Sequence, residues 1–367
     1  MFAVLPYAEL LSCIDNIDPV AYARTRNYQT GSVTRLSPYI SRGVVSTRFI
    51  FDRLRAAGHT WKEMEKLVQE LAWRDYFQRV WQVRGPSLVE ELKHPQQHIV
   101  HGEIPVAVVN AVTGIQAIDE GIFGLYREGY MHNHMRMYVA SVCCNIGRAH
   151  WLQPARWMYY HLLDADWGSN ACSWQWVCGA FSNKRYFANQ ENINRFFGTA
   201  QQHTFLDLPY EAMEHIPVPD VLSRSTPFMV DALLPASDEI ASAHSEKVLL
   251  YNWYNLDPFW HKDEPCTRIL LLEPEIFGRY PIAPHSVAFM LQLARAIPGL
   301  RVFTGSFAEL KQYFPHARFY YKEHPWNHYD GCEEPRDWLA PGVNGWYPGF
   351  FPYWTKVSAV LQKELNV

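Results

Sequence analysis

The chain has 367 residues, of which 48% are hydrophobic and 19% are charged, and its formal net charge is −4. This balance excludes a disordered polymer and leaves room for two domains with a large core. The negative charge argues against a generally basic nucleic-acid-binding protein. Aromatic residues make up 15% of the chain, including 14 Trp and 21 Tyr. They favour a large aromatic core, stacking surfaces for bases or a ring cofactor, or an electron path.

Hydropathy and cysteine usage indicate the compartment. No apolar run is long enough to cross a bilayer, and the first residues lack the basic region and cleavage site of a secretory signal. We therefore expect a soluble, cytoplasmic protein with no membrane partner. The seven Cys contain no CxxC pair, so we expect reduced structural thiols. His132 and His134 are two residues apart, which is poor spacing for a shared helical site, so no metal is expected.

Residues 1–205 have the periodicity of helices. The clearest case is 60–83, whose apolar residues recur every three or four positions and whose start carries Thr60 and Glu63 in a capping-box pattern. Further helices are expected at 43–57, 105–128, 131–147 and 154–164. No strand-like alternation of any length occurs in this region.

The chain changes character after residue 205. Residues 206–246 hold five Pro and scattered Ser and are predicted to form a connector. Strand-like runs then alternate with helix-like stretches, which predicts a small α/β sheet. The expected strands are 247–254, 268–273, 300–304 and 318–321, and the expected helices are 285–297 and 307–314. The fold class is therefore α followed by α/β: a helical domain over 1–205, a Pro-rich connector over 206–246, and a small α/β domain with an irregular tail over 247–367.

Two segments of the helical region carry polar residues that suit a ligand. Residues 31–43 place Ser32, Thr34 and Ser37 just ahead of a helix, where free backbone N–H groups suit a phosphate, although an ordinary N-cap loop has the same pattern. On the helix 60–83, Glu70 and Arg74 share one face. A surface ion pair explains them, but Trp73 between them also suits a polar pocket with a flat wall.

The third segment is DADWGSNACSWQW, residues 164–176. It combines two acids two residues apart, Asn170, and two Trp two residues apart, in a predicted loop between helices. Carboxylates bind hard cations, but these acids are too few for such a site.

Five segments together resemble the FAD-binding domain of the photolyase and cryptochrome family. They are TRLSPYISRGVVS, ELAWRDYF, TGIQAIDEGI, GYMHNHMRM and DADWGSNACSWQW, in the family's order and approximate spacing. The resemblance covers about residues 22–200 and implies an all-helical photolyase-type FAD-binding domain, here followed by the small C-terminal α/β domain. Family members usually begin with an α/β antenna domain, which we expect this chain to lack at its N-terminus. Residues 247–330 loosely resemble part of that antenna domain.

The resemblance implies which residues hold FAD. The phosphates would be held by Tyr22, Thr34, Arg35, Leu36 and Ser37. Val33 stands where a Thr is common, which removes one hydroxyl contact.

The resemblance assigns the remaining flavin contacts to five further residues. Arg74 would lie near the phosphates, and Arg136 on a helix under the ring would pair with Asp164. Asp166 would accept from the ring N3–H. Asn170 would face N5, where an Asn favours the reduced flavin that photolyases use.

The resemblance also implies a pocket for damaged DNA. Glu70 would bond the damaged base, with Trp73 and Trp176 as aromatic walls. Asn133 and Met137 occupy positions where (6-4)-type photolyases carry His, which favours cyclobutane pyrimidine dimers.

In the family, a chain of three Trp delivers electrons to the flavin. Trp174 and Trp151 match the inner two positions, and the outer one falls at His98. Either another aromatic residue such as Tyr159 or Tyr160 substitutes, or photoreduction is slow.

The resulting hypothesis is a light-driven deoxyribodipyrimidine photolyase that uses FAD. Its partner would be damaged DNA, in single or double strands, and we expect a monomer. The alternatives are a (6-4) photolyase, a blue-light receptor without repair activity, and a flavin-binding relic. The function of the α/β domain and the identity of any antenna chromophore stay open.

Overall fold

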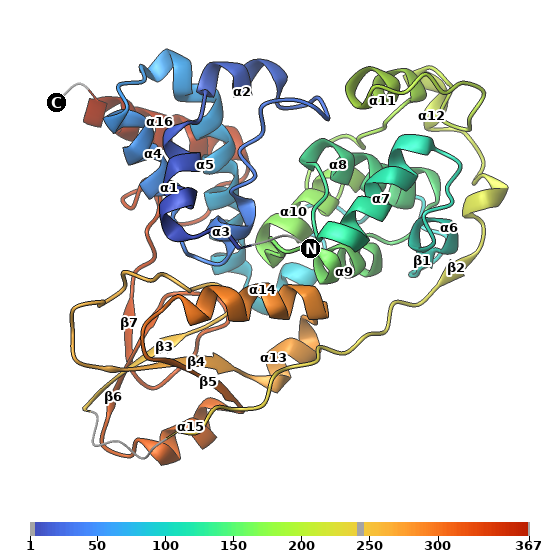
Figure 1. The fold of residues 1–367 in the computed structure, drawn as a ribbon. Helices are drawn as coiled ribbons and strands as arrows, with labels where there is room; N and C mark the ends of the chain where they lie inside the picture. Colours follow the sequence, from blue (N-terminus) through green and yellow to red (C-terminus); the bar gives the residue numbers. More distant parts are fainter. Residues whose placement is uncertain (1–3, 241–245, 366–367) are drawn as a thin grey trace. The chain divides into compact units, whose positions relative to one another are not determined.

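The computed structural model describes residues 4–240 and 246–365, which divide between two compact units (Figure 1). The helical unit consists of residues 18–33 and 84–230. The mixed unit consists of residues 34–83 together with the described residues of 2–17 and 231–367. The helix-rich first half of the chain therefore contributes to both units. The domain boundaries expected at 205 and 246 stay a prediction.

The helical unit has helices in the regions where they were expected at 105–128, 131–147 and 154–164, together with one short sheet. The two-residue strands β1 (Ile104–Pro105) and β2 (Ser225–Thr226) pair antiparallel. Its helices are α2 (Pro19–Thr25), η1 (Gly85–Val89), α6 (Val106–Val109), α7 (Gln116–Glu128), α8 (Asn133–Ser141), the π-helix η2 (Val142–Ile146), α9 (Leu152–His161), α10 (Trp167–Cys178), α11 (Gln190–Phe197), α12 (Tyr210–Met213) and η3 (Asp220–Leu222).

The single helix expected over 105–128 is wrong. Helix α6 ends at Val109 and α7 begins at Gln116. Between them, Ala111 and Gly114 adopt left-handed backbone, with φ of 54° and 80°, which ends a helix. Thr113 donates from its N–H and its hydroxyl to Asp119, at 2.8 and 2.7 Å, and so stabilises the turn. Apolar spacing that continues through the turn hid this break.

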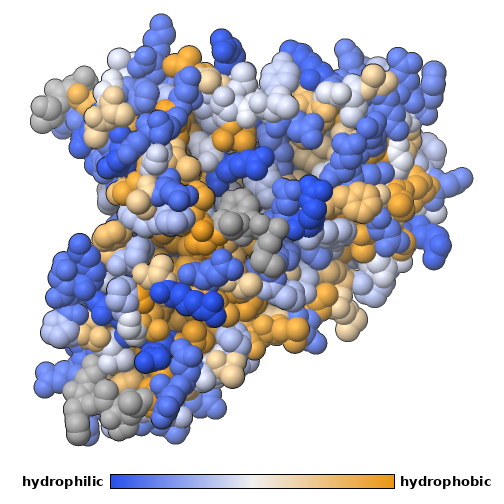
Figure 2. All heavy atoms as spheres, in the orientation of Figure 1, coloured by the Kyte–Doolittle hydropathy of each residue, from blue (hydrophilic) through white to orange (hydrophobic). Residues whose placement is uncertain are grey.

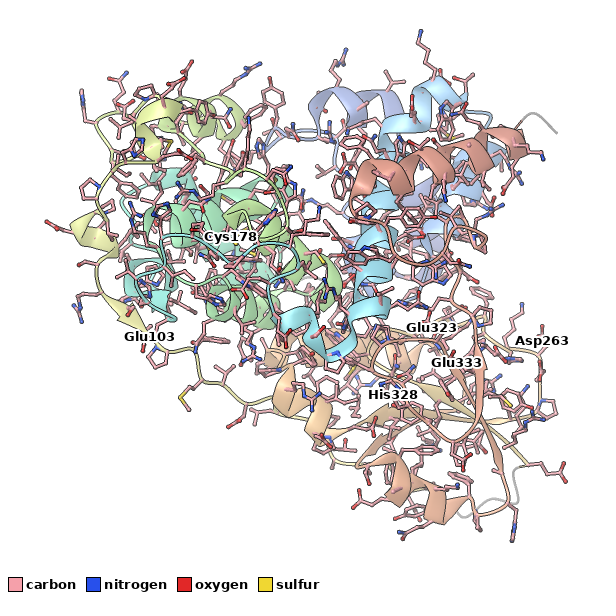
Figure 3. The ribbon with its side chains drawn as sticks, turned by 180° about the vertical axis from the view of Figure 1, so that it is seen from behind. Glu103, Cys178, Asp263, Glu323, His328 and Glu333 are labelled. Atoms are coloured by element: carbon pink, nitrogen blue, oxygen red, sulfur yellow. The ribbon has the colours of Figure 1, made fainter. Side chains whose placement is uncertain are left out.

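The core of the helical unit centres on α10, which packs against α8 and α9. Trp167 and Trp174 on this helix are buried, and Cys178, labelled in Figure 3, lies at its end. Asp166 caps the start, and Gly179 (φ 88°) ends the helix. All seven Cys lie within the described ranges and are free thiols, as expected.

The mixed unit is built on a five-stranded sheet that is parallel throughout. Its strands are β3 (Lys247–Tyr251), β4 (Thr267–Leu272), β5 (Leu300–Thr304), β6 (Arg318–Lys322) and β7 (Cys332–Glu334), in the order β5-β4-β3-β6-β7. Figure 1 shows α14 (Pro284–Arg295) and α15 (Phe307–Tyr313) on opposite sides of this sheet. This arrangement confirms the expected α/β alternation. The two helices cover the two faces that a parallel sheet must bury.

Helices from early in the chain belong to the same unit. They are α1 (Tyr7–Asp15), α3 (Ser37–Ser41), α4 (Thr47–Ala56) and α5 (Trp61–Arg84), and α13 (Pro274–Arg279) follows β4. The link to the sheet is Arg42, which is fully buried with its guanidinium carbon 3.3 Å from the ring centroid of Trp253. The N–H of Leu256 donates to the carbonyl of Arg42 at 2.8 Å. The segment that carries the predicted phosphate residues is thus fastened to the loop after β3.

The expectation of an irregular tail is wrong at the C-terminal end. Helix α16 spans Phe350–Leu365 and buries Phe350, Tyr353, Trp354, Val357 and Leu361 at helical spacing. The Pro and Gly that suggested irregular structure precede the helix or lie in its first turn. There, Pro352 is tolerated because the N–H that it lacks has no intrahelical partner.

The described surface mixes polar and apolar side chains. Figure 2 shows both kinds interspersed on the face in view. Among the described residues, none of the helices combines the length and the apolar character that a membrane span needs. Within the same ranges, no cluster of three His, Cys, Asp or Glu side chains is arranged to hold a metal ion.

A buried carboxylate fastens the segment before α16 to α5. Asp75 accepts from the Thr47 hydroxyl at 3.0 Å and from the Leu339 N–H at 2.7 Å. Nearby, Arg336 pairs with Glu323, labelled in Figure 3, at 2.9 Å. Burial raises the pKa of Asp75 from 3.8 to about 6, although its two hydrogen bonds and the neighbouring Arg side chains oppose this shift.

The raised pKa of Asp75 predicts a pH dependence of stability. The folded state holds the Asp75 proton more tightly than the unfolded chain. The contribution of this proton to the free energy of unfolding is therefore complete below the ordinary pKa of 3.8 and is lost as the pH rises through about 6. The loss should be about 3 kcal/mol. Asp75→Asn should flatten the pH profile of the unfolding free energy by that amount in denaturant titrations. Parallel profiles for the two proteins would contradict this assignment.

Candidate flavin and nucleic-acid site

The predicted site residues are divided between the two units. The mixed unit carries Thr34, Arg35, Leu36, Ser37, Glu70, Trp73 and Arg74. The helical unit carries Tyr22, Asn133, Arg136, Met137, Trp151, Asp164, Asp166, Asn170, Trp174 and Trp176. Each set has its own geometry.

An ion pair joins the two residues that the sequence expects as partners. Nη2 of Arg136 on α8 lies 3.0 and 2.9 Å from the two carboxylate oxygens of Asp164, and its Nε donates to the Met131 carbonyl at 2.9 Å. The Asp164 side chain is 4% exposed and that of Arg136 is 21% exposed. Charge-assisted bonds of this kind fix both side chains, so α8 and the loop before α10 are held together.

The start of α10 presents buried acceptors. Asp166 accepts from the Ser169 N–H at 3.2 Å and from its hydroxyl at 3.1 Å, so it caps the helix, a role that the sequence analysis missed. A carboxylate oxygen is the kind of acceptor that a ligand N–H requires. Asn170 donates from Nδ2 to the Ala155 carbonyl at 2.8 Å, so its Oδ1 is oriented as an acceptor. This set suits the donor edge of a flavin ring.

Asn133 and Met137 lie four residues apart on α8. Asn133 is exposed at the first residue of the helix, and Met137 is half-buried. His132 caps this helix, with its Nδ1 accepting from the His134 N–H at 3.2 Å. Both predicted pocket residues therefore have surface left for a ligand.

One of the two predicted electron-transfer residues lies beside a Trp that the sequence pattern did not single out. Trp151 and Trp174 are buried, and the Trp151 ring lies 6.4 Å from that of Trp167. Trp167 in turn lies 5.7 Å from Tyr159. The DADW segment was the available signal for Trp167. His98, at the outer position, has left-handed backbone with φ of 60° and offers no oxidisable ring.

The predicted phosphate segment leads into α3. Ser37 is the first residue of this short helix, and the Leu36 N–H donates to the Thr34 hydroxyl at 3.4 Å. Arg35 has left-handed backbone with φ of 53°. Nη1 of Arg74 donates to the Ser41 hydroxyl at 2.8 Å, so the predicted phosphate ligand on α5 is held against α3.

Glu70 forms an ion pair with a lysine one turn earlier on α5. Nζ of Lys66 lies 2.9 Å from Oε1 of Glu70, and the two side chains are 34% and 28% exposed. An exposed pair of this kind contributes less than about 1 kcal/mol, so it does not prevent the carboxylate from binding a ligand.

Trp73 stacks on a residue from the far end of the chain. Its ring lies 3.7 Å from that of Phe350, with 9° between the planes. The stack continues from Phe350 to Trp354 at 6.2 Å and 11°, and from Trp354 to Trp61 at 5.9 Å and 16°. This ladder of four rings joins the two helices, with its two outer rings on α5 and its two inner rings on α16. Phe350 covers one face of Trp73, but the Trp73 side chain is only half-buried. The ring therefore keeps exposed surface for a second stacking partner.

The ladder predicts an energetic coupling between Trp73 and Phe350. In a double-mutant cycle with Trp73→Ala and Phe350→Ala, the unfolding free energies should be non-additive by about 1 kcal/mol, the value of a stacked aromatic pair. Val360→Ala is the matched control, since Val360 lies on α16 with 37% of its surface exposed, and its cost should add to that of Trp73→Ala. Additive costs for Trp73 and Phe350 would contradict the coupling.

Comparisons of this chain with a family model and with individual relatives agree with one another. Residues 67–211 match the family described as the FAD binding domain of DNA photolyase. A deoxyribodipyrimidine photo-lyase of Alkalihalophilus pseudofirmus is 27% identical over 207 residues, covering 53% of this chain and 42% of that protein. One of Streptomyces griseus is 31% identical over 156 residues, covering 42% and 34%. Cryptochrome DASH of Vibrio parahaemolyticus is 30% identical over 208 residues, covering 48% and 45%. The chain thus spans less than half the length of these relatives.

Among solved structures, a bacterial class III photolyase from Agrobacterium tumefaciens is similar, at 23% identity and a TM-score of 0.42. The similarity covers 52% of this chain and 43% of that one.

Proposed function

Because the FAD-binding region of this chain belongs to the photolyase and cryptochrome family, we propose that the protein repairs cyclobutane pyrimidine dimers in DNA by light-driven electron transfer. The observation that carries the proposal is the buried polar set around α10. Asp164, Asp166 and Asn170 are each 9% exposed or less, and their hydrogen bonds fix their acceptor atoms. Buried acceptors whose positions are fixed in this way are the groups that the polar edge of a flavin requires.

When bound and reduced, FAD would supply one electron on absorbing blue light, and a dimer that receives an electron splits and gives it back. The protein therefore binds and orients, and needs little acid–base chemistry. Trp73 and Trp176 offer stacking surfaces to flipped-out bases, each worth about 1–3 kcal/mol. Glu70 would hydrogen-bond the damaged base, and this bond would strengthen as negative charge develops there.

The substrate in this proposal is a damaged strand, and the protein acts as a monomer. Asn133 and Met137, which have surface left for a ligand, support dimers over (6-4) products, because neither can do the acid–base work of His. To test this, the purified, reduced protein would be irradiated with blue light on two strands, one with a cyclobutane dimer and one with a (6-4) product. Repair of the dimer strand alone is expected. Repair of the (6-4) strand alone would reverse the lesion assignment.

Blue-light sensing is the second candidate. The similarity to a cryptochrome DASH and the His98 at the outer electron-transfer position favour it. A receptor would bind FAD and change its partner binding in light without restoring either lesion, so the same irradiation experiment separates the two functions.

A further inference from the structure

Tyr186 in the helical unit faces a histidine that can take its proton. Its hydroxyl lies 3.4 Å from Nε2 of His134 on α8. Nδ1 of His134 lies 3.2 Å from the carbonyl oxygen of Asn27. A carbonyl can only accept, so Nδ1 carries the hydrogen, and Nε2 presents its lone pair to the Tyr186 hydroxyl.

Both groups stay neutral at rest. Burial, aided by the charge of Arg26, lowers the pKa of His134, so its imidazole is unprotonated near neutral pH. Burial and the neighbouring Tyr210 raise the pKa of Tyr186, so its phenol keeps its proton. The pair therefore consists of a protonated phenol and a free base.

The phenol also adjoins an oxidisable ring of the proposed site. The Tyr186 and Trp176 ring centroids are 5.9 Å apart with 39° between the planes. Both side chains are half-buried, so the pair lies at the edge of the unit rather than deep in its core.

We propose that Tyr186 and His134 form a proton-coupled redox pair that re-reduces oxidised Trp176. One electron passes from Tyr186 to the Trp176 radical cation, which becomes neutral Trp. The Tyr186 O–H bond breaks, its proton moves to Nε2 of His134, and a neutral tyrosyl radical and an imidazolium remain. In the cell, the oxidant of Trp176 would be a light-excited oxidised flavin, and this identification rests on the proposed function. The redox pair of Tyr186 and His134 does not depend on that function.

Two other tyrosines show why this one differs. Tyr126 lies 6.2 Å from Trp157, but its hydroxyl donates to the Val109 carbonyl at 2.6 Å, and a carbonyl is too weak a base to take the proton. Tyr138 donates to the amide oxygen of Asn192, which is equally unsuited. The rings of Tyr126 and Tyr138 also contact histidine rings, at 4.6 and 4.5 Å between centroids. Of these three phenols, Tyr186 is the one whose hydroxyl contact is with a histidine nitrogen.

The experiment oxidises the purified full chain with a flash-generated ruthenium(III) tris-bipyridine and detects radicals by electron paramagnetic resonance. The expected result is a tyrosyl radical whose yield falls in Tyr186→Phe and stays at the wild-type level in the matched control Tyr126→Phe. His134→Ala should also lose it, and added imidazole should restore it. A structural role for His134 would not give this rescue.

Equal tyrosyl yields in Tyr186→Phe and Tyr126→Phe would overturn the proposal, as would a full yield in His134→Ala without imidazole. The oxidant is external, so absent repair or absent flavin would refute the proposed function without affecting this result.

Discussion

Replacing Arg136 by Ala should lower the free energy of unfolding by about 3 kcal/mol, because it removes the guanidinium partner of the Asp164 carboxylate, whose side chain is 4% exposed. The same change should cost the protein its flavin, since Asp164 leads directly into the acceptors at the start of α10. Denaturant titration measures the first effect, and the flavin absorbance of the purified protein measures the second.

The matched control for Arg136 is Arg127→Ala. Arg127 pairs with Glu128, but its side chain is 75% exposed. Its loss should cost less than about 1 kcal/mol and leave the flavin in place. Similar small losses for both variants would show that the Arg136–Asp164 pair does not organise the site.

Replacing Glu70 by Gln should slow repair about 10- to 100-fold while leaving FAD bound. A hydrogen bond to a charged group is worth about 1.5–3 kcal/mol, and the neutral amide cannot supply the same bond. Single-turnover repair under blue light measures the effect, and the flavin spectrum checks the cofactor.

Lys66→Ala is the control for Glu70, because it breaks the 2.9 Å ion pair on α5 but keeps the carboxylate. Its repair rate should stay close to that of the wild type. If Glu70→Gln repairs at the wild-type rate, Glu70 does not bind the damaged base, and its role is limited to the surface pair.

Local patterns predicted most of the fold. Apolar spacing placed the long helix α5 and the strands β3 to β6, because each buries a regular face. The same reasoning failed where one or two residues decide whether a helix begins or ends. Ala111 and Gly114 break a helix within continuing apolar spacing, and Pro352 hid α16 although a first turn tolerates Pro.

The candidate site was predictable where partners belong to one motif set, as with Arg136 and Asp164. It was not predictable where the partner comes from a distant segment. Trp73 stacks on Phe350, 277 positions later in the sequence, and Tyr186 meets His134 across 52 positions. Such contacts depend on tertiary packing, which periodicity and residue spacing do not predict.

The measurement that most directly tests light-driven repair uses a short single strand carrying one cyclobutane thymine dimer. The purified, chemically reduced protein is incubated with it in blue light and in the dark, and intact thymines are counted. Light-driven repair predicts recovery in the light and none in the dark. Bound FAD with no recovery in either condition would contradict it and leave blue-light sensing as the function of this site.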